Sequence, residues 1–124
     1  MDTSVWVELL NERRPDSQSD IDPLQFVTCG PVVQEVLQGL RETAAARQFS
    51  QAFEALPCLA DPLPRHLFVA AAGIFRSGRR RGYTIRSSVH CLIAAIAIEY
   101  AIPVWHRDRD FEAIAAFTDL RTIS

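Results

Sequence analysis

Four acids stand out by position as candidate ligands of a divalent cation, namely Asp2, Glu35, Asp108 and Asp110, and His90 stands where we expect a further acid. Carboxylate oxygens from separate elements are the protein ligands that Mg²⁺ and Mn²⁺ prefer. A bound ion of this kind can activate water and stabilise negative charge on a phosphate. If these residues meet in space, they indicate metal-dependent chemistry on a phosphate ester.

Each of these residues also has an ordinary structural role open to it. Asp110 can cap the N-terminus of a helix that begins at Phe111, and Asp2 can cap a helix that follows it. Glu35 can be a solvated residue at the rim of a helix, and a lone histidine in an apolar helix is often a hydrogen-bonded core residue. The residues by themselves leave both the metal site and the structural roles open.

Helices that alternate with short apolar strands position these residues. Apolar periodicity predicts helices over residues 4–14, 31–40, 44–56, 64–81, 89–100 and 111–117. It predicts strands over 26–28, 103–106 and 120–123, a connector or strand over 57–59 and a polar loop over 15–23. This alternation indicates one α/β domain with a parallel sheet. Sites in such sheets lie at the carboxyl ends of strands, and Asp108 and Asp110 follow the strand over 103–106.

The composition fits one soluble globular domain. Hydrophobic residues make up 48% of the 124 residues, which is enough for a core, and the formal net charge is only −2. All 13 basic residues are arginine, which binds phosphate bidentately. The three cysteines form no CxxC pair, which argues against a zinc site or a disulfide framework. Because we find neither a signal peptide nor an apolar run of about 18 residues, we expect a cytoplasmic protein that does not enter a membrane.

Four motifs, in order along the chain, carry a family resemblance. They are the stretches Asp2–Val7, Val33–Gly39, Arg86–Ala95 and His106–Phe111. Together they resemble the motifs of PIN-domain ribonucleases, and in particular of the VapC toxins of toxin–antitoxin pairs. Their order and spacing match across essentially the whole chain. The resemblance implies a single PIN-like domain over residues 1–124, with a three-layer α/β/α fold and a central parallel sheet.

The resemblance also implies what the motif residues do. Asp2, Glu35 and Asp108 match the acids that line the family's metal pocket, Asp110 matches an acid at its rim, and Ser87 matches a small hydroxyl residue that helps to order the site. The implied activity is that of a Mg²⁺- or Mn²⁺-dependent endoribonuclease. The implied catalytic residues are Asp2, Glu35, Asp108 and Asp110, and the implied metal ligands are Asp2, Glu35, His90 and Asp108. The implied partners are a VapB-type antitoxin, an RNA substrate and a second copy of the chain in a homodimer.

A basic segment offers a surface for RNA. Arg79, Arg80, Arg81 and Arg86 can contact backbone phosphates, which supply affinity without sequence choice. Tyr83, which lies between them, can stack on a base. Cations at the C-terminal end of a helix also suit the helix dipole, so a solvated helix end is the structural alternative.

Two features depart from the family pattern. His90 stands where the family has an aspartate, and imidazole is a poor ligand for Mg²⁺ but a good one for Mn²⁺, Zn²⁺ or Ni²⁺. His90 therefore leaves a weakened Mg²⁺ site, shifts the preference to a borderline metal, or marks an inactive relative. The family's first strand precedes its first acid and lies mid-sheet, whereas only Met1 precedes Asp2 here. We expect a truncated or shortened first strand, whose absence would leave its neighbours without a ladder partner.

Three functions from different classes remain open at this stage. The first, which we expect, is the endoribonuclease toxin. The second is a catalytically silent PIN-like module that binds an antitoxin or RNA. The third is a receiver domain of the response-regulator type, which the lack of any lysine disfavours because receivers use a lysine beside their phosphorylated acid.

Overall fold

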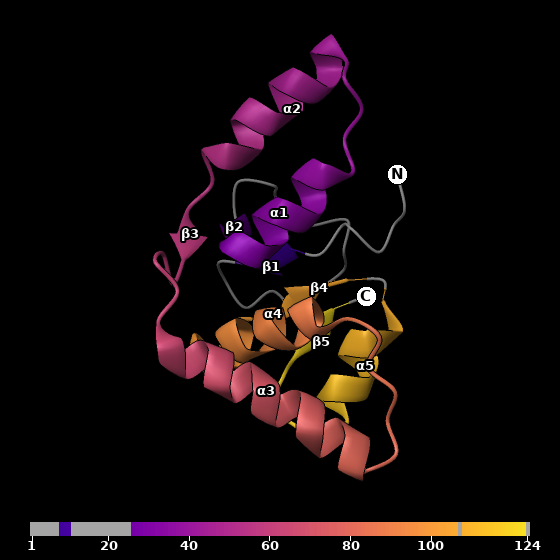
Figure 1. Ribbon diagram of the computed structural model, residues 1–124. Helices are drawn as coiled ribbons and strands as arrows, with labels where there is room; N and C mark the ends of the chain where they lie inside the picture. Colours follow the sequence, from indigo (N-terminus) through magenta and orange to yellow (C-terminus); the bar gives the residue numbers. More distant parts are fainter. Residues whose placement is uncertain (1–7, 11–25, 107, 124) are drawn as a thin grey trace.

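A computed structural model of the chain describes residues 8–10, 26–106 and 108–123 (Figure 1). The described strands are β1 (Glu8–Leu10), β2 (Phe26–Cys29), β3 (Cys58–Leu59), β4 (Val104–Trp105) and β5 (Thr122–Ile123). The described helices are α1 (Gly30–Gln38), α2 (Ala44–Glu54), α3 (Arg65–Arg80), α4 (Ser88–Glu99) and α5 (Arg109–Ala115). Apart from β1, each element lies where the sequence pattern predicts it, with ends that differ by at most two residues.

One mixed sheet joins the strands in the order β3-β2-β1-β4-β5. The two outer pairs, β2 with β3 and β4 with β5, are parallel, as the alternation of elements predicts. The central strand β1 runs antiparallel to both neighbours, with Leu9 paired to Val27 on one side and to Val104 on the other. The prediction of a wholly parallel central sheet is therefore wrong at β1.

β1 also overturns the helix predicted over residues 4–14. Leu9 and Leu10 have spacing that suits a helix, but Glu8–Leu10 forms a strand. Val27 and Val104 are buried, and the backbones of their strands need hydrogen-bond partners on the side where β1 lies. Such tertiary pairing outweighs the local periodicity of a short segment. Glu8–Leu10 thus takes the mid-sheet position that was expected to lack a strand. The segment before Asp2 and the loop predicted over 15–23 lie outside the described residues.

Helix α4 forms the centre of the hydrophobic core. It is apolar around most of its circumference, and such a helix is largely buried. Seven of its residues are buried: His90, Cys91, Ile93, Ala94, Ala95, Ile96 and Ala97. α3 packs along α4, and α1 and α5 also contact it (Figure 1). The first turn of α4 therefore carries His90 into the interior. Among the described helices, none combines the length and apolar character that crossing a membrane requires.

The segment between α3 and α4 depends on two glycines. Gly82 has a φ of 86°, in the left-handed region that favours glycine, and it turns the chain back after α3. A Cβ at Gly78 would lie only 2.8 Å from Ile85 Cδ1, so the missing side chain lets the buried Ile85 pack against α3. This turn brings Arg86 and Ser87 to the start of α5.

Candidate metal centre

Four side chains from three helices meet in an acid–histidine cluster, made of Glu35, His90, Asp108 and Asp110. Glu35 comes from α1, His90 from the first turn of α4, and the two aspartates from the start of α5. His90 Nδ1 lies 2.9 Å from Asp110 Oδ2 and 3.9 Å from Asp108 Oδ1, and His90 Nε2 lies 3.5 Å from Glu35 Oε1. The side chains are only 3 to 17% exposed. Asp2, which was expected to join them, lies outside the described residues.

Asp110 is the most heavily hydrogen-bonded acid of the cluster. Its Oδ1 accepts the Arg86 backbone N–H at 3.0 Å, and its Oδ2 accepts the Ser87 backbone N–H at 3.0 Å and contacts His90 Nδ1 at 2.9 Å. Burial by itself would raise the pKa of Asp110, but the hydrogen bonds from Arg86, His90 and Ser87 outweigh it and lower the pKa below its usual value. Asp110 is therefore an ionised acceptor that ties the entry to α4 to the start of α5.

Asp108, rather than Asp110, caps helix α5. Asp108 precedes the helix with extended backbone, and its Oδ1 accepts the Asp110 backbone N–H at 2.8 Å. The alternative in which Asp110 caps a helix beginning at Phe111 is wrong, because α5 begins two residues earlier, at Arg109. Asp110 instead lies in the first turn, where a negative charge suits the helix dipole.

Ser87 and Cys91, which lie near His90 in sequence, do not use their polar side-chain atoms in the cluster. Ser87 precedes α4 but makes no side-chain cap, and it bonds Asp110 through its backbone N–H. Cys91 is buried, and burial, reinforced by the charge of Asp110, raises the pKa of its thiol to about 11. Its sulfur therefore stays protonated at neutral pH in the metal-free chain.

His106 is a residue of the site region that we did not predict from the sequence. It follows β4, is 2% exposed, and its Nδ1 accepts the Asp108 backbone N–H at 3.0 Å. Its Nε2 is buried without a hydrogen-bond partner among the described residues. The Phe111 ring packs between the two histidines, with centroids 5.1 Å from His106 and 4.7 Å from His90. The only signal in the sequence was its position between an apolar strand and two acids.

We expect His106 to make the fold sensitive to mild acid. Burial lowers its pKa below 6.5, and the charges of Glu112 and Asp108 oppose that shift only in part. A base with a lowered folded-state pKa binds fewer protons when folded, so stability is complete above its unfolded pKa and falls as the pH drops below that value. The free energy of unfolding, measured by urea titration from pH 7.5 down to 5, should decline less steeply in His106→Asn than in the parent.

His66 provides the control for this measurement, because it is exposed and far from the cluster. His66→Gln should keep the slope of the parent. If His106→Asn also keeps that slope, burial of a neutral His106 does not govern the acid response.

The predicted RNA-binding arginines lie on one exposed stretch. Arg79 and Arg80 end α3, Arg81 follows them, and Arg86 lies one residue before Ser87. Arg79 lies over the Phe75 ring at 5.7 Å, and Arg81 lies over the Phe117 ring at 5.8 Å while donating to the Ser77 hydroxyl. Tyr83 stacks on Phe117, with centroids 5.3 Å apart, and is 38% exposed. Backbone hydrogen bonding by Arg86 links this stretch to Asp110.

The donor set of the acid–histidine cluster fits a divalent cation. His90, Asp108 and Asp110 can each offer one ligand atom, and these atoms lie within 4.8 Å of one another. Glu35 adds a third carboxylate, 3.5 Å from His90. Carboxylates suit Mg²⁺ and Mn²⁺, whereas an imidazole suits softer ions. The residues therefore fit a divalent metal through a set that contains one nitrogen donor.

Known proteins match this chain over nearly its whole length. The PIN domain family model matches residues 1–116. The "VapC ribonuclease Mb1587" of Mycobacterium bovis is 35% identical over 132 aligned residues, covering 100% of this chain and 96% of the relative. The "Ribonuclease VapC11" of Mycobacterium tuberculosis matches with the same identity and coverage. The family resemblance of the four motifs is thereby confirmed. This chain belongs to the PIN-domain family, among the VapC proteins.

Proposed function

We propose that this chain is a divalent-metal-dependent endoribonuclease, the toxin of a VapBC-type toxin–antitoxin pair. The acid–histidine cluster is the observation that carries the proposal, because three helices converge to bury three carboxylates and an imidazole together. The relatives, named as ribonucleases, support the reaction class. The proposed fold is a single PIN domain over 1–124 with α/β/α layers, and the proposed cofactor is Mg²⁺ or Mn²⁺.

In this proposal the side chains have three separate roles: metal binding, positioning of a ligand, and RNA binding. When bound, a divalent ion would supply an activated water and would stabilise the charge that develops on the phosphodiester. Asp2, Glu35, His90 and Asp108 are the proposed ligands. Asp110 acts as a positioning residue in place of the catalytic role that the resemblance implies, because both of its oxygens already accept hydrogen bonds from the protein. In the proposal the RNA backbone lies on Arg79, Arg80, Arg81 and Arg86, which are exposed, and the Arg86 backbone N–H is bonded to Asp110 of the cluster.

Replacing Asp108 with Asn tests the reaction directly. Asn caps a helix as well as Asp does, so α5 keeps its cap while the cluster loses one negative charge. We expect metal-supported RNA cleavage to fall about 100-fold, the scale on which losing one charge-stabilising group acts. Cleavage of a labelled RNA in Mg²⁺ and in Mn²⁺ measures the effect. Asp119→Asn, at an exposed acid beyond α5, should cleave like the parent.

One observation favours the second candidate, the silent module that binds an antitoxin or RNA. The imidazole of His90 fills the space between Asp110 and Glu35, so the cluster has three carboxylates rather than four to hold a hard cation. A folded parent that cleaves RNA in neither metal would support this candidate. If the parent cleaves and Asp108→Asn cleaves equally well, the cluster is not the catalytic site.

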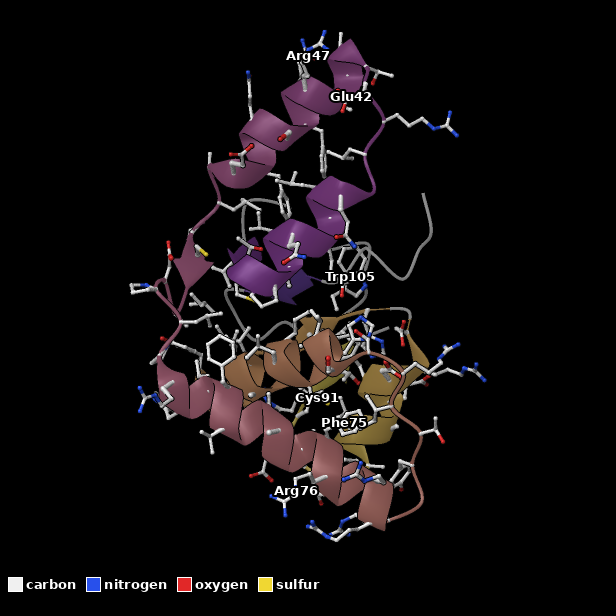
Figure 2. The ribbon with its side chains drawn as sticks, viewed as in Figure 1. Glu42, Arg47, Phe75, Arg76, Cys91 and Trp105 are labelled. Atoms are coloured by element: carbon white, nitrogen blue, oxygen red, sulfur yellow. The ribbon has the colours of Figure 1, made fainter. Side chains whose placement is uncertain are left out.

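The VapB-type antitoxin, the homodimer and the cytoplasm as the site of action belong to the same proposal. A groove of about 490 Å³ between α3 and α4 supports the dimer. Its lining is mainly apolar: Phe68, Ala71, Ala72, Phe75, Arg76, Ser88, Val89 and Leu92. Figure 2 shows Phe75 and Arg76 on α3, with Cys91 on the neighbouring α4. Exposed apolar side chains that gather in one place are typical of an interface, and a second copy of the chain occupies this groove in the proposed dimer.

Replacing Phe68 with Arg is expected to convert the dimer to a monomer. Phe68 lines the groove and is 50% exposed, so the added charge would be buried at the interface without costing the monomer its fold. Size-exclusion chromatography with light scattering, at equal concentrations, measures the mass. Val69→Arg is the matched control, because Val69 is the next residue, is 65% exposed and lies outside the groove lining. A monomeric parent, or a dimeric Phe68→Arg, contradicts a dimer through this groove.

A further inference from the structure

Given the metal site of the proposed function, on which this step rests, we infer that His90 is a nitrogen ligand of that site through Nε2. Asp110 holds the imidazole in place from the other side. The site therefore takes Mn²⁺, Co²⁺ or Zn²⁺ in preference to Mg²⁺. Three features carry this assignment: the position of the imidazole proton, the atom that Nε2 faces, and the way Asp110 is itself held.

The proton of the His90–Asp110 contact lies on the histidine. Asp110 accepts two backbone N–H groups, and an ionised carboxylate can only accept. The 2.9 Å contact between Nδ1 and Oδ2 is therefore donated by Nδ1–H. In the neutral imidazole, this leaves the lone pair on Nε2.

Nε2 faces the carboxylate of Glu35. The distance of 3.5 Å from Nε2 to Oε1 is longer than the roughly 2.7 to 3.2 Å of a good N–H···O hydrogen bond. A lone pair and a carboxylate oxygen that face each other this closely repel unless a cation lies beside them. Two ligand atoms that are each about 2.1 Å from one ion are separated by roughly 3 to 3.5 Å. The spacing thus suits a shared divalent ion.

The arrangement matches the way proteins orient a metal-binding histidine. Such a histidine usually donates its second N–H to a carboxylate, which fixes its tautomer and raises its basicity. Asp110 is well suited to this role because two backbone N–H groups fix its own orientation. The chain also contains a contrasting pair, His66 with Glu99 at 2.7 Å, which is exposed and has no further described acid within ion-pairing distance of His66.

The choice of ion follows from the donors. Replacing a carboxylate by an imidazole removes one negative charge and one hard oxygen, and both changes act against Mg²⁺. Imidazole suits Zn²⁺ and other first-row transition ions, and Mn²⁺ tolerates both donor types.

Metal binding to the purified full-length chain tests the assignment without reference to RNA cleavage. Calorimetric titration with Mn²⁺, Co²⁺ and Mg²⁺ should give at least about 10-fold tighter binding of Co²⁺ and Mn²⁺ than of Mg²⁺. His90→Asp should shrink that ratio at least 10-fold, and His66→Gln should leave it unchanged. Asp110→Asn should weaken Co²⁺ binding about 10- to 100-fold, as expected for a positioning partner, and alter the visible Co²⁺ spectrum.

A spectrum of the parent alone guards against variants that fail to fold. In a two-dimensional ¹H–¹⁵N spectrum that detects histidine ring nitrogens, Zn²⁺ should shift the Nε2 signal of His90 while Nδ1 stays protonated. The assignment is overturned if Zn²⁺ leaves that signal unchanged, or if His90→Asp keeps the parent's ratio of Co²⁺ to Mg²⁺ affinity. RNA cleavage with an unchanged metal ranking would leave the proposed function standing without this inference. The expected metal preference without RNA cleavage would support this inference and contradict the proposed function.

Discussion

Replacing Asp110 with Ala is expected to lower the free energy of unfolding by about 3 kcal/mol, because three donors lose their acceptor at once. The donors are the backbone N–H groups of Arg86 and Ser87 and the Nδ1–H of His90. His90 and Asp110 are both buried, so water cannot readily replace the lost carboxylate there. Urea unfolding at pH 7 measures the change.

Two further variants serve as comparisons: Asp110→Asn is a milder change at the same position, and Asp119→Ala is a change at an exposed acid. Asn keeps the size of the side chain but has only one oxygen, so it can serve fewer of the three donors and should cost less than Ala. Asp119 is exposed, and its replacement should change stability by no more than about 0.5 kcal/mol. A loss below about 1 kcal/mol for Asp110→Ala would mean that this carboxylate does not hold the entry to α4 against α5.

Replacing Phe111 with Ala should destabilise the chain by about 3 to 5 kcal/mol, the range for deleting a buried aromatic ring. Phe111 is 0% exposed and is the largest fully buried side chain among the described residues. Its ring also lies against the rings of both His90 and His106, so the cavity would open directly behind the metal centre. We therefore expect weaker metal binding together with the loss of stability, measured by calorimetry and by urea unfolding.

Tyr100→Ala is the control for that experiment, because it removes an aromatic ring from a position that is 43% exposed and lies outside the groove lining. It should cost less than about 1 kcal/mol and leave metal binding unchanged. Phe111→Leu refills most of the volume and should retain more stability than Phe111→Ala. Equal losses for Phe111→Ala and Tyr100→Ala would contradict a core role for Phe111.

The helices were predictable because their burial shows in local patterns. The continuous apolar run of α4 can only be buried, and the proline at the start of α1 and the threonine before α2 mark their first turns. Strand β1 was not predictable in this way. Its three residues pair with Phe26 and Val27 on one side and with Val104 and Trp105 on the other, and both partner strands are distant in sequence. A segment of three residues is too short to show the hydrophobic periodicity that distinguishes a strand from a helix.

The family motifs predicted which residues gather at the site, but not how they share its hydrogen bonds. Glu35, His90, Asp108 and Asp110 do lie together, from three helices. The cap went to Asp108 because the start of α5 is set by the path of the chain leaving β4, and a sequence pattern gives helix ends only to within a few residues. His106 was missed because its importance depends on the Phe111 ring and the Asp108 N–H, which it meets only in the folded chain.

The cap made by Asp108 has a consequence for how this chain tolerates change. Any side chain that accepts a hydrogen bond at this position, such as Asn, Ser or Thr, can begin α5, whereas the proposed chemistry needs the carboxylate. Asp110 is different, because the same carboxylate that orients His90 also holds two backbone segments together. In a library selected for cells that survive the toxin, position 108 should therefore yield abundant, well-folded escape variants. Position 110 should yield escape variants whose protein level falls along with their toxicity.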